Sequence, residues 1–518
     1  MHRTTLLSRL ALSAPAMAVA LAACPTVRSP ELLPSNQPPV QREESILPLK
    51  VHLITGDLLL LDRWQEWPGD SGVIGSGTRY DTRRHPIGTF EGKLPGDSIA
   101  LLEVTRTTTA TPAGSVVLGT YTVLMGAVTA VCLADPKSCF GSCPTFYLND
   151  SDDRPVAEGF SASVARVLEA TDVDDLGHIS ASGRRFTLTM RNEALETHAV
   201  RSVRLLVARR PARGTLVRGA GGGYFTATDS AAPASCIGGG EDCVAAVRAR
   251  DGYEWATRAD STDLAARDSV DLMFPASTGP RALLVTSRQS FITTYVFYQS
   301  LAWAGSRAGD LLADLERRGT SALPGAWTIL RRLTEVEVFA APAGEPLRPA
   351  GVFGEAGPIA ADQHALPLPG IPAEVPLHVR LRFARGGWRF DRVATVSIAP
   401  APDPVALLPL LVERAGAEDT VARQRLLDPG RHLITQPGDA YRLTFALPHD
   451  GRQLTFFLES RGYYYEWMRP EWLAEENPAL LGLIAMAPDQ ALQRMAPDYA
   501  RIEPRLEALF WASRFGRR

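Results

Sequence analysis

Apolar and polar residues alternate along much of the chain with a period of two, which is typical of strands that face a core on one side and water on the other. Residues 377–383 are the clearest case, because every second residue there is Leu, Val or Phe and the residues between them are His or Arg. Other short strand-like segments, some alternating and some continuously apolar, occur at 49–54, 58–61, 98–104, 186–190, 203–207, 281–286, 335–339, 388–393, 441–445 and 454–458. Because turns rich in Gly and Pro separate many of these segments, we predict a mainly β, multi-domain protein built from β-sandwiches or small β-barrels.

The N-terminus has the pattern of an export signal. A basic start is followed by a short apolar stretch that ends Leu21-Ala22-Ala23-Cys24, which is typical of a secretory signal peptide and too short for a permanent span. This tetrapeptide resembles the lipobox of bacterial lipoproteins, in which the Cys thiol is acylated and becomes the new N-terminus. The resemblance implies a lipid on Cys24; an ordinary cleavage site before a Cys is the alternative. Residues 25–46 are rich in Pro, Ser, Gln and Glu, so we expect a disordered tether there.

Two segments depart from the strand pattern. Residues 114–134 carry no charge over about 20 residues, the length of a membrane-spanning helix. A crossing there would send the later cysteines of an anchored chain into the cytoplasm, where disulfides rarely persist. We therefore predict an apolar helix packed on its own domain or on the bilayer surface, with a true span as the alternative. Residues 470–518 show helical periodicity and predict a helical C-terminal tail.

Composition excludes one class of partner. The chain has 518 residues with 54 Lys and Arg against 57 Asp and Glu, and its formal net charge is −3. The basic residues are scattered and form no stripe with interleaved aromatic residues, so the sequence gives no reason to expect nucleic-acid binding.

The cysteines suit an oxidising compartment. Cys236 and Cys243 flank the flexible sequence Ile-Gly-Gly-Gly-Glu-Asp, and Cys139 and Cys143 are separated by Phe-Gly-Ser. Both spacings allow the two sulfur atoms of a pair to reach bonding distance. We predict two disulfides that each close a small loop, with Cys132 left as a thiol.

Three segments resemble landmarks of uncharacterised bacterial envelope lipoproteins. They are residues 139–147 (Cys-Phe-Gly-Ser-Cys-Pro-Thr-Phe-Tyr), 191–198 and 462–467. The resemblance covers most of the mature chain and implies an envelope location, but it transfers no activity. Residues 276–400 also resemble galactose-binding-like jelly rolls in strand spacing and in the sequence Trp-Arg-Phe-Asp at 388–391; such folds carry many functions.

These observations together predict the domain organisation. We expect a signal peptide at 1–23, a lipidated tether at 24–46, a small β-domain at 47–110, an apolar helix at 111–136, a β-domain at 137–275, a jelly-roll-like β-domain at 276–400, and β-strands followed by helices at 401–518.

The Cys139-x-x-x-Cys143-Pro144 motif is the most specific chemical candidate. It is similar to the copper site of Sco-type chaperones, because soft thiolates select Cu(I), and His198 would be the third ligand to test. That family places the motif between a strand and a helix, whereas a strand-like segment follows it here. A structural disulfide is therefore favoured, and we expect no bound metal or cofactor.

Two further groups are candidates for ligand binding. Asn192, Glu196 and His198 share one face if their segment is a strand and could form a carboxylate–imidazole site; a polar strand end with a salt bridge to a neighbouring Arg is the alternative. The second group consists of three aromatic residues and one arginine: Trp388, Arg389, Tyr464 and Trp467. Flat rings of this kind suit the faces of pyranose sugars, although such rings more often pack in a core.

No nucleophile elbow, zinc-protease helix or phosphate-binding loop occurs in the sequence. We therefore expect a lipid-anchored protein of the bacterial cell envelope that binds or scaffolds rather than catalyses. The outer membrane is favoured over the periplasmic face of the inner membrane, because Pro25 after the anchor gives no inner-membrane retention signal. A glycan or another envelope protein would be the partner. The alternatives are a carbohydrate-binding surface protein and a copper or thiol-redox protein that uses Cys139 and Cys143.

Overall fold

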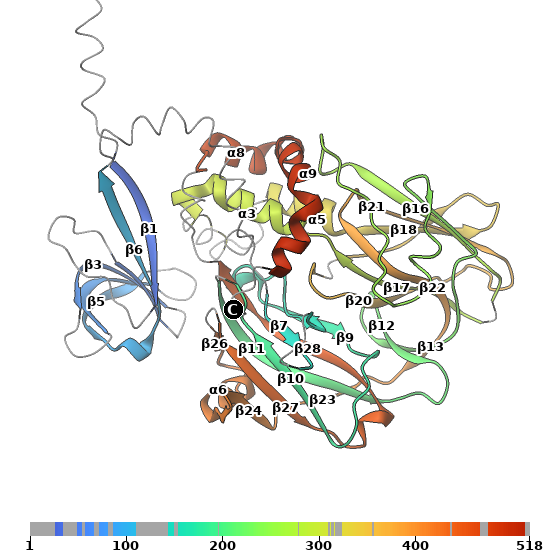
Figure 1. Cartoon of the computed structure of the whole chain (residues 1–518), viewed down its shortest axis with the longest axis horizontal. Coiled ribbons are helices and arrows are strands. Elements are labelled where there is room, and N and C mark those ends of the chain that lie inside the picture. The colour runs from blue at the N-terminus through green and yellow to red at the C-terminus, as the bar shows by residue number, and fades with distance from the viewer. Residues whose placement is uncertain are drawn as a thin grey trace, which may run out of the picture. The chain divides into compact units, whose positions relative to one another are not determined.

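The computed structural model (Figure 1) describes residues 26–34, 49–53, 57–66, 72–80, 86–109, 143–149, 154–194, 196–277, 279–308, 311, 315, 324–354, 357–435, 438–466 and 475–512. The chain divides into two compact units, Met1–Asp81 with Pro86–Val131 and Thr82–His85 with Cys132–Arg518. Strands predominate in both units, so the prediction of a mainly β protein is confirmed. The predicted apolar helix at 111–136 lies outside the described residues.

The first unit contains a six-stranded antiparallel sheet in the order β1-β6-β2-β3-β4-β5. Its strands are β1 (Thr26–Pro34), β2 (Leu49–Leu53), β3 (Leu58–Glu66), β4 (Val73–Tyr80), β5 (Pro86–Leu94) and β6 (Ile99–Thr109). Alternate residues of β2 and β3 are fully buried, namely Leu49, Val51, Leu59 and Leu61. This burial follows the period of two in the sequence.

One part of the predicted tether is a strand. Residues Thr26–Pro34 form β1, which pairs antiparallel with β6 along its whole length. The composition of this segment indicated disorder because of its prolines. However, β1 lies at the edge of the sheet, where Pro is tolerated because its missing N–H can face away from the neighbouring strand.

The second unit begins with a β-sandwich. One sheet has the order β25-β24-β27-β10-β7-β8, and the other has the order β23-β11-β28-β9 with β26 paired to β11. The strands are β7 (Thr145–Tyr147), β8 (Ala157–Glu158), β9 (Ala170–Asp175), β10 (Arg185–Arg191), β11 (Glu196–Arg209), β23 (Val405–Leu407), β24 (Leu411–Arg414), β25 (Ala417–Glu418), β26 (Leu433–Thr435), β27 (Ala440–Ala446) and β28 (Leu454–Glu466). Side chains of both sheets meet in one core, as Leu188 and Phe445 do with Leu205 and Phe456.

A closed five-stranded barrel follows, in the order β12-β13-β22-β17-β20. Its strands are β12 (Thr215–Gly219), β13 (Tyr224–Ala231), β17 (Arg281–Gln289), β20 (Asp362–Pro367) and β22 (Trp388–Ala401). A further sheet has the order β15-β14-β16-β21-β18-β19, from strands β14 (Ser235–Gly238), β15 (Glu241–Asp242), β16 (Arg267–Phe274), β18 (Val336–Pro342), β19 (Arg348–Phe353) and β21 (Leu377–Ala384).

Strand β17 joins the barrel to this sheet. Ala282 and Leu284 pack inside the barrel, whereas Leu283 and Val285 pack with the side chains of the neighbouring sheet. All nine residues of β17 are consequently buried. The apolar run at 282–285 suits a strand that is covered on both faces.

The domain boundaries predicted within the second unit are wrong. The sandwich takes strands from both 143–209 and 405–466, and the barrel with its neighbouring sheet is inserted between them. The barrel also contains a parallel pair, β12 with β20, which departs from the antiparallel jelly roll expected at 276–400. Pairing between strands so distant in the chain leaves no mark in local alternation, so the sequence pattern placed the boundaries between strands that are partners.

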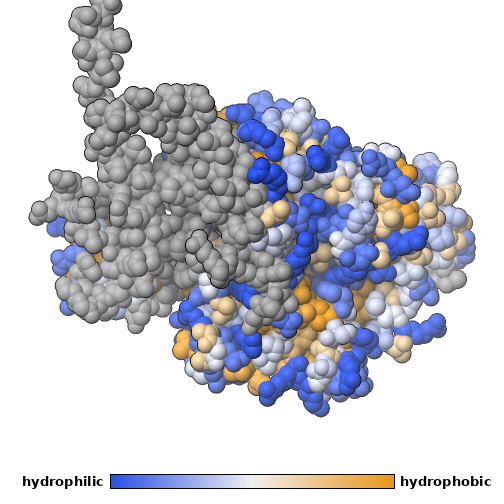
Figure 2. Space-filling model, viewed as in Figure 1, coloured by the Kyte–Doolittle hydropathy of each residue, from blue (hydrophilic) through white to orange (hydrophobic). Residues whose placement is uncertain are grey.

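Helices complete the second unit: α3 (Ile292–Ala304), α5 (Pro324–Thr334), α6 (Thr420–Leu427), α8 (Pro478–Met486) and α9 (Pro488–Ala512). The last two confirm the predicted helical tail. Figure 1 shows α9 in red beside α3, and rings of these two helices stack, with centroids 5.1 Å apart for Tyr295 and Tyr499. None of the helices in the described part of the chain is long and apolar enough to cross a membrane. Hydrophilic residues cover most of the described surface in the view of Figure 2.

Candidate functional site

Two arginines lie directly opposite each other where β17 and β22 pair. Arg288 is next to the last residue of β17, and Arg389 is the second residue of β22; their Cα atoms are register partners. Like charges opposite each other on neighbouring strands are destabilising. The pair therefore needs carboxylates close by, and the structure provides two.

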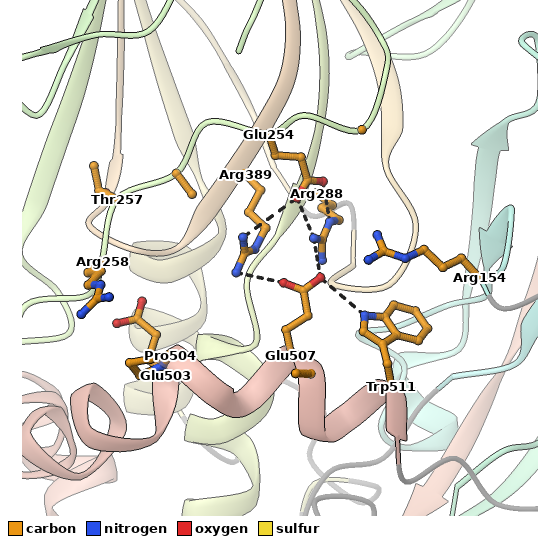
Figure 3. Close-up of a pocket in the computed structure, with 13 residues that line it drawn as sticks. Arg154, Glu254, Thr257, Arg258, Arg288, Arg389, Glu503, Pro504, Glu507 and Trp511 are labelled. Atoms are coloured by element: carbon orange, nitrogen blue, oxygen red, sulfur yellow. Dashed lines mark hydrogen bonds and ion pairs between the residues drawn. The ribbon is translucent and has the colours of Figure 1, made fainter.

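Glu254, in the loop between β15 and β16, and Glu507, on α9, neutralise these arginines (Figure 3). Arg288 donates from Nε and Nη2 to the two carboxylate oxygens of Glu254, both at 2.6 Å. Its Nη2 also donates to Glu507 Oε1 at 2.7 Å, and Arg389 Nη2 lies 3.0 Å from Glu507 Oε2. Burial alone would raise the pKa of Glu507, but the two guanidinium groups outweigh it and lower that pKa.

Helix α9 presents one polar face to this pair. Glu503, Glu507 and Trp511 follow one another at intervals of four residues, which places them on the same side of a helix. Figure 3 shows all three pointing from α9 toward the strands. Trp511 Nε1 donates to Glu507 Oε1 at 3.4 Å. Other side chains of α9, Tyr499 and Leu506 among them, are buried in the helical core.

Glu503 has a different environment from Glu507. Its carboxylate accepts the backbone N–H of Ala259 at 2.9 Å. Burial raises the pKa of Glu503, and the opposing influence of that N–H, Arg258 and Arg389 is too small to cancel the rise. The two glutamates on one helix face therefore titrate in opposite directions from their ordinary value, which is a common property of binding and catalytic sites.

These side chains line an open pocket of about 580 Å³, within the range of about 300–1,000 Å³ that small-ligand sites occupy. Arg154 and Arg258 complete its walls (Figure 3). The guanidinium carbon of Arg154 lies 5.7 Å from the centre of the Trp511 ring, within cation–π range. Neither Arg154 nor Arg258 forms an ion pair with another residue that the structure describes.

Among the described members of the predicted sugar-binding group (Trp388, Arg389 and Tyr464), Arg389 alone lines this pocket. Trp388 is fully buried, with its ring 5.8 Å from that of Phe353, so it cannot present a face to a sugar. The reason is the period of a strand: consecutive residues point to opposite faces, and Trp388 takes the core side. Tyr464 is also buried, and its hydroxyl donates to Ser161 O at 2.9 Å. Trp467 lies outside the described residues.

The structure does bring Asn192, Glu196 and His198 together. Asn192 Nδ2 donates to the backbone oxygen of Glu196 at 2.9 Å, and Glu196 Oε1 lies 3.0 Å from His198 Nε2. The expected geometry differs in one respect, because Asn192 follows β10 in the connection to β11 and does not share a strand with the other two. All three side chains are almost completely buried, so they tie strand ends together and offer no open site.

The structure contains the predicted Cys236–Cys243 disulfide, with the two Cα atoms 5.0 Å apart. Both residues are buried in the core between the barrel and its neighbouring sheet. Cys24, Cys132 and Cys139 lie outside the described residues, so the lipid anchor, the thiol and the Cys139–Cys143 bond stay predictions. Within the described ranges, no group of three or more His, Cys, Asp or Glu side chains is arranged to hold a metal ion.

Sequence reasoning missed seven residues of the pocket, namely Arg154, Glu254, Arg258, Arg288, Glu503, Glu507 and Trp511. A signal existed for three of them, since the four-residue spacing on α9 is visible in the sequence. Glu254 and Arg288 gave no such signal, because they come from a loop and a buried strand that meet only in the folded chain.

Comparison with known proteins adds little to this geometry. No protein-family model matches the chain, and no curated protein matches it. Among solved structures, the chain is similar to the secreted serine protease VesC from Vibrio cholerae, with 10% sequence identity and a TM-score of 0.13. The match covers 63% of each chain, so the protein spans less than two thirds of that protease. A likeness this weak carries no argument about activity, and the function is argued from the pocket alone.

Proposed function

We propose that this chain is a lipid-anchored binding protein of the bacterial cell envelope, and that the pocket between Arg389 and α9 binds an anionic, hydroxyl-rich ligand such as an acidic sugar. The observation that carries the proposal is the pair Arg154 and Arg258, whose guanidinium groups border an open pocket and form no ion pair with another described residue. The resemblance of Leu21-Ala22-Ala23-Cys24 to a lipobox supports the envelope location. The outer membrane is the favoured site of anchoring.

The balance of charge in the pocket favours an anion over a neutral sugar. Four arginines (154, 258, 288 and 389) face three glutamates (254, 503 and 507), which gives a formal charge of 4 − 3 = +1. A guanidinium fork matches a carboxylate through two parallel hydrogen bonds. The glutamates supply acceptors for hydroxyl groups, and the ring of Trp511 supplies an apolar wall.

The first prediction tests Arg154 and Arg258. The full-length protein should bind galacturonate and show at least tenfold weaker binding of galactose in titration calorimetry. Arg154→Gln and Arg258→Gln should each weaken the binding of galacturonate by roughly tenfold, because a hydrogen bond to a charged group contributes about 1.5–3 kcal/mol.

Arg213→Gln is the matched control, because Arg213 is also exposed and forms no ion pair with another described residue, yet does not line the pocket. It should bind as the unmodified protein does. Equal affinity for the charged and the neutral sugar, or equal losses in all three variants, would exclude this pocket as the binding site.

The second prediction concerns pH. Because the pKa of Glu503 is raised, this residue becomes protonated before an exposed glutamate as the pH falls, and the pocket charge then rises from +1 to +2. Affinity for galacturonate should be higher at acidic than at neutral pH, by roughly fivefold once Glu503 is protonated, since removing one nearby negative charge favours an anion by about 1 kcal/mol. Arg258 and Arg389 are the cations that face Glu503. Glu503→Gln should show high affinity at both pH values, and an unchanged pH profile in this variant would contradict the assignment.

A further inference from the structure

A second cavity lies between helices of the second unit and is lined mainly by apolar side chains. Its volume is about 450 Å³, which also falls in the usual range of ligand sites. Helix α3 contributes Val296, Phe297 and Leu301, α5 contributes Leu330 and Leu333, and α8 contributes Leu481. None of these side chains belongs to the charged pocket, so the two cavities are separate sites.

Helix α8 forms one wall of this cavity and is only partly buried. Its sequence, Pro-Ala-Leu-Leu-Gly-Leu-Ile-Ala-Met, has no charged residue. A helix that is apolar on all sides is normally buried, yet of its residues only Ile484 is fully buried and Met486 is 88% exposed. Gly482 lines the cavity, and a Cβ atom added there would meet no atom within 4 Å. The wall formed by α8 therefore borders empty space.

One polar group at the end of β17 belongs to the cavity lining. Gln289 is 3% exposed, and its backbone N–H donates to Gly357 O at 2.8 Å. Its side-chain Nε2, however, has no hydrogen-bond partner among the described residues. Leaving a buried donor unpaired is costly, and buried polar groups in native proteins nearly always have a partner. A ligand oxygen in the cavity would supply the missing acceptor.

We propose that this cavity binds a single long acyl chain, with the hydrocarbon between α3, α5 and α8 and a carbonyl or carboxylate oxygen accepting a hydrogen bond from Gln289. Mainly apolar walls match an amphiphile of this kind, because each methylene removed from water adds to the affinity. Gln289 Nε2 and Trp327 Nε1 both line the cavity and have no hydrogen-bond partner among the described residues, so they are the donors available to the polar end of the chain. The proposal does not depend on the function of the charged pocket.

The test uses the full-length protein and a fluorescent fatty acid, 11-(dansylamino)undecanoate, which brightens in an apolar site. We expect saturable binding with one probe per chain and displacement by palmitate. Gly482→Leu should weaken the probe at least tenfold, because Gly482 lines the cavity and a Cβ atom there meets no other atom, so a larger side chain can occupy space that the probe would need. Gly221→Leu is the matched control, since a Cβ atom at Gly221 also meets no atom within 4 Å and Gly221 does not line the cavity. Absence of saturable binding, or equal binding by the two variants, would overturn the proposal.

A second variant tests the polar end. Gln289→Leu should keep the unfolding midpoint of the unmodified protein within a few degrees and bind palmitate roughly tenfold more weakly. A folded Gln289→Leu protein that binds palmitate with full affinity would overturn the assignment of that residue. Displacement of the probe by palmitate alone assigns a free fatty acid, whereas displacement by phosphatidylglycerol vesicles as well assigns an acyl chain of a membrane phospholipid.

Discussion

Replacement of Trp388 by alanine is expected to lower the free energy of unfolding by about 3–5 kcal/mol, the usual cost of truncating a large buried ring. The side chain is fully buried. It stacks on Phe390, with ring centroids 6.3 Å apart, and its edge contacts Phe353. Removing it would open a cavity in the core shared by the barrel and its neighbouring sheet. Chemical denaturation of the full-length protein, followed by circular dichroism, measures the loss.

Trp388→Phe separates packing from hydrogen bonding. The indole Nε1 of Trp388 is buried and has no acceptor among the described residues, so the smaller ring removes an unpaired donor along with some apolar volume. Its cost should be well under half that of Trp388→Ala. Stability unchanged by Trp388→Ala, together with loss of sugar binding, would instead show that this ring reaches the ligand.

Glu169→Gln should cost about 2–3 kcal/mol at pH 7, because one carboxylate accepts hydrogen bonds from two arginines and lies within hydrogen-bonding distance of His432. Arg201 binds both oxygens of Glu169, Arg461 donates at 2.8 Å, and His432 Nε2 lies 3.3 Å away. The register of β11 against β28 shifts at Arg201. Such irregularities re-aim side chains, and here the side chain reaches Glu169.

The effect of Glu169→Gln should depend on pH. Burial alone would raise the pKa of Glu169, but the hydrogen bonds from Arg201, His432 and Arg461 outweigh it and hold that pKa well below the usual range. The stabilisation is therefore complete above about pH 4.5, the ordinary value of a glutamate, and is lost as the pH falls toward the lowered pKa. Denaturation curves at several pH values should show the two proteins converging in acid.

Asp450→Asn is the control for this series. The pKa of Asp450 is lowered to about 2, mainly by a hydrogen bond from the side chain of Arg452. This pair joins residues two positions apart on the surface, so its loss should leave the unfolding midpoint unchanged. A Glu169→Gln protein as stable as Asp450→Asn at pH 7 would refute the network.

Local pattern predicted those features that a few neighbouring residues determine. Strand β21 follows the alternation of 377–383, with its apolar residues buried and its charged ones partly or fully exposed. The tail is helical, and Cys236 and Cys243 form their bond. The same alternation already separated Trp388 and Phe390 from Arg389. It therefore indicated that the ring and the guanidinium group could not share one surface, although the sequence analysis grouped them.

Features that depend on distant partners could not be predicted in this way. The sandwich pairs β10 with β27 and β11 with β28. The sequence of each strand does not indicate which distant strand will pair with it. The charged pocket unites a loop, two strand ends and a C-terminal helix. Arg288 in particular lies in a strand whose residues are all buried, where sequence reasoning expects only apolar side chains.

The insertion of the barrel between two halves of the sandwich has a consequence for the order of assembly. Every barrel strand lies between residues 215 and 401, so the barrel can close before any strand of the second half has been synthesised. Strand β11, by contrast, has to wait for β28, whose residues come about 250 positions later. Loop closure over such a distance is slow, and unpaired strand edges promote aggregation in the meantime. The folded barrel shortens this search. It holds residues 215 and 401 within one compact body, so the strands that follow residue 401 start close to the strands that precede residue 215.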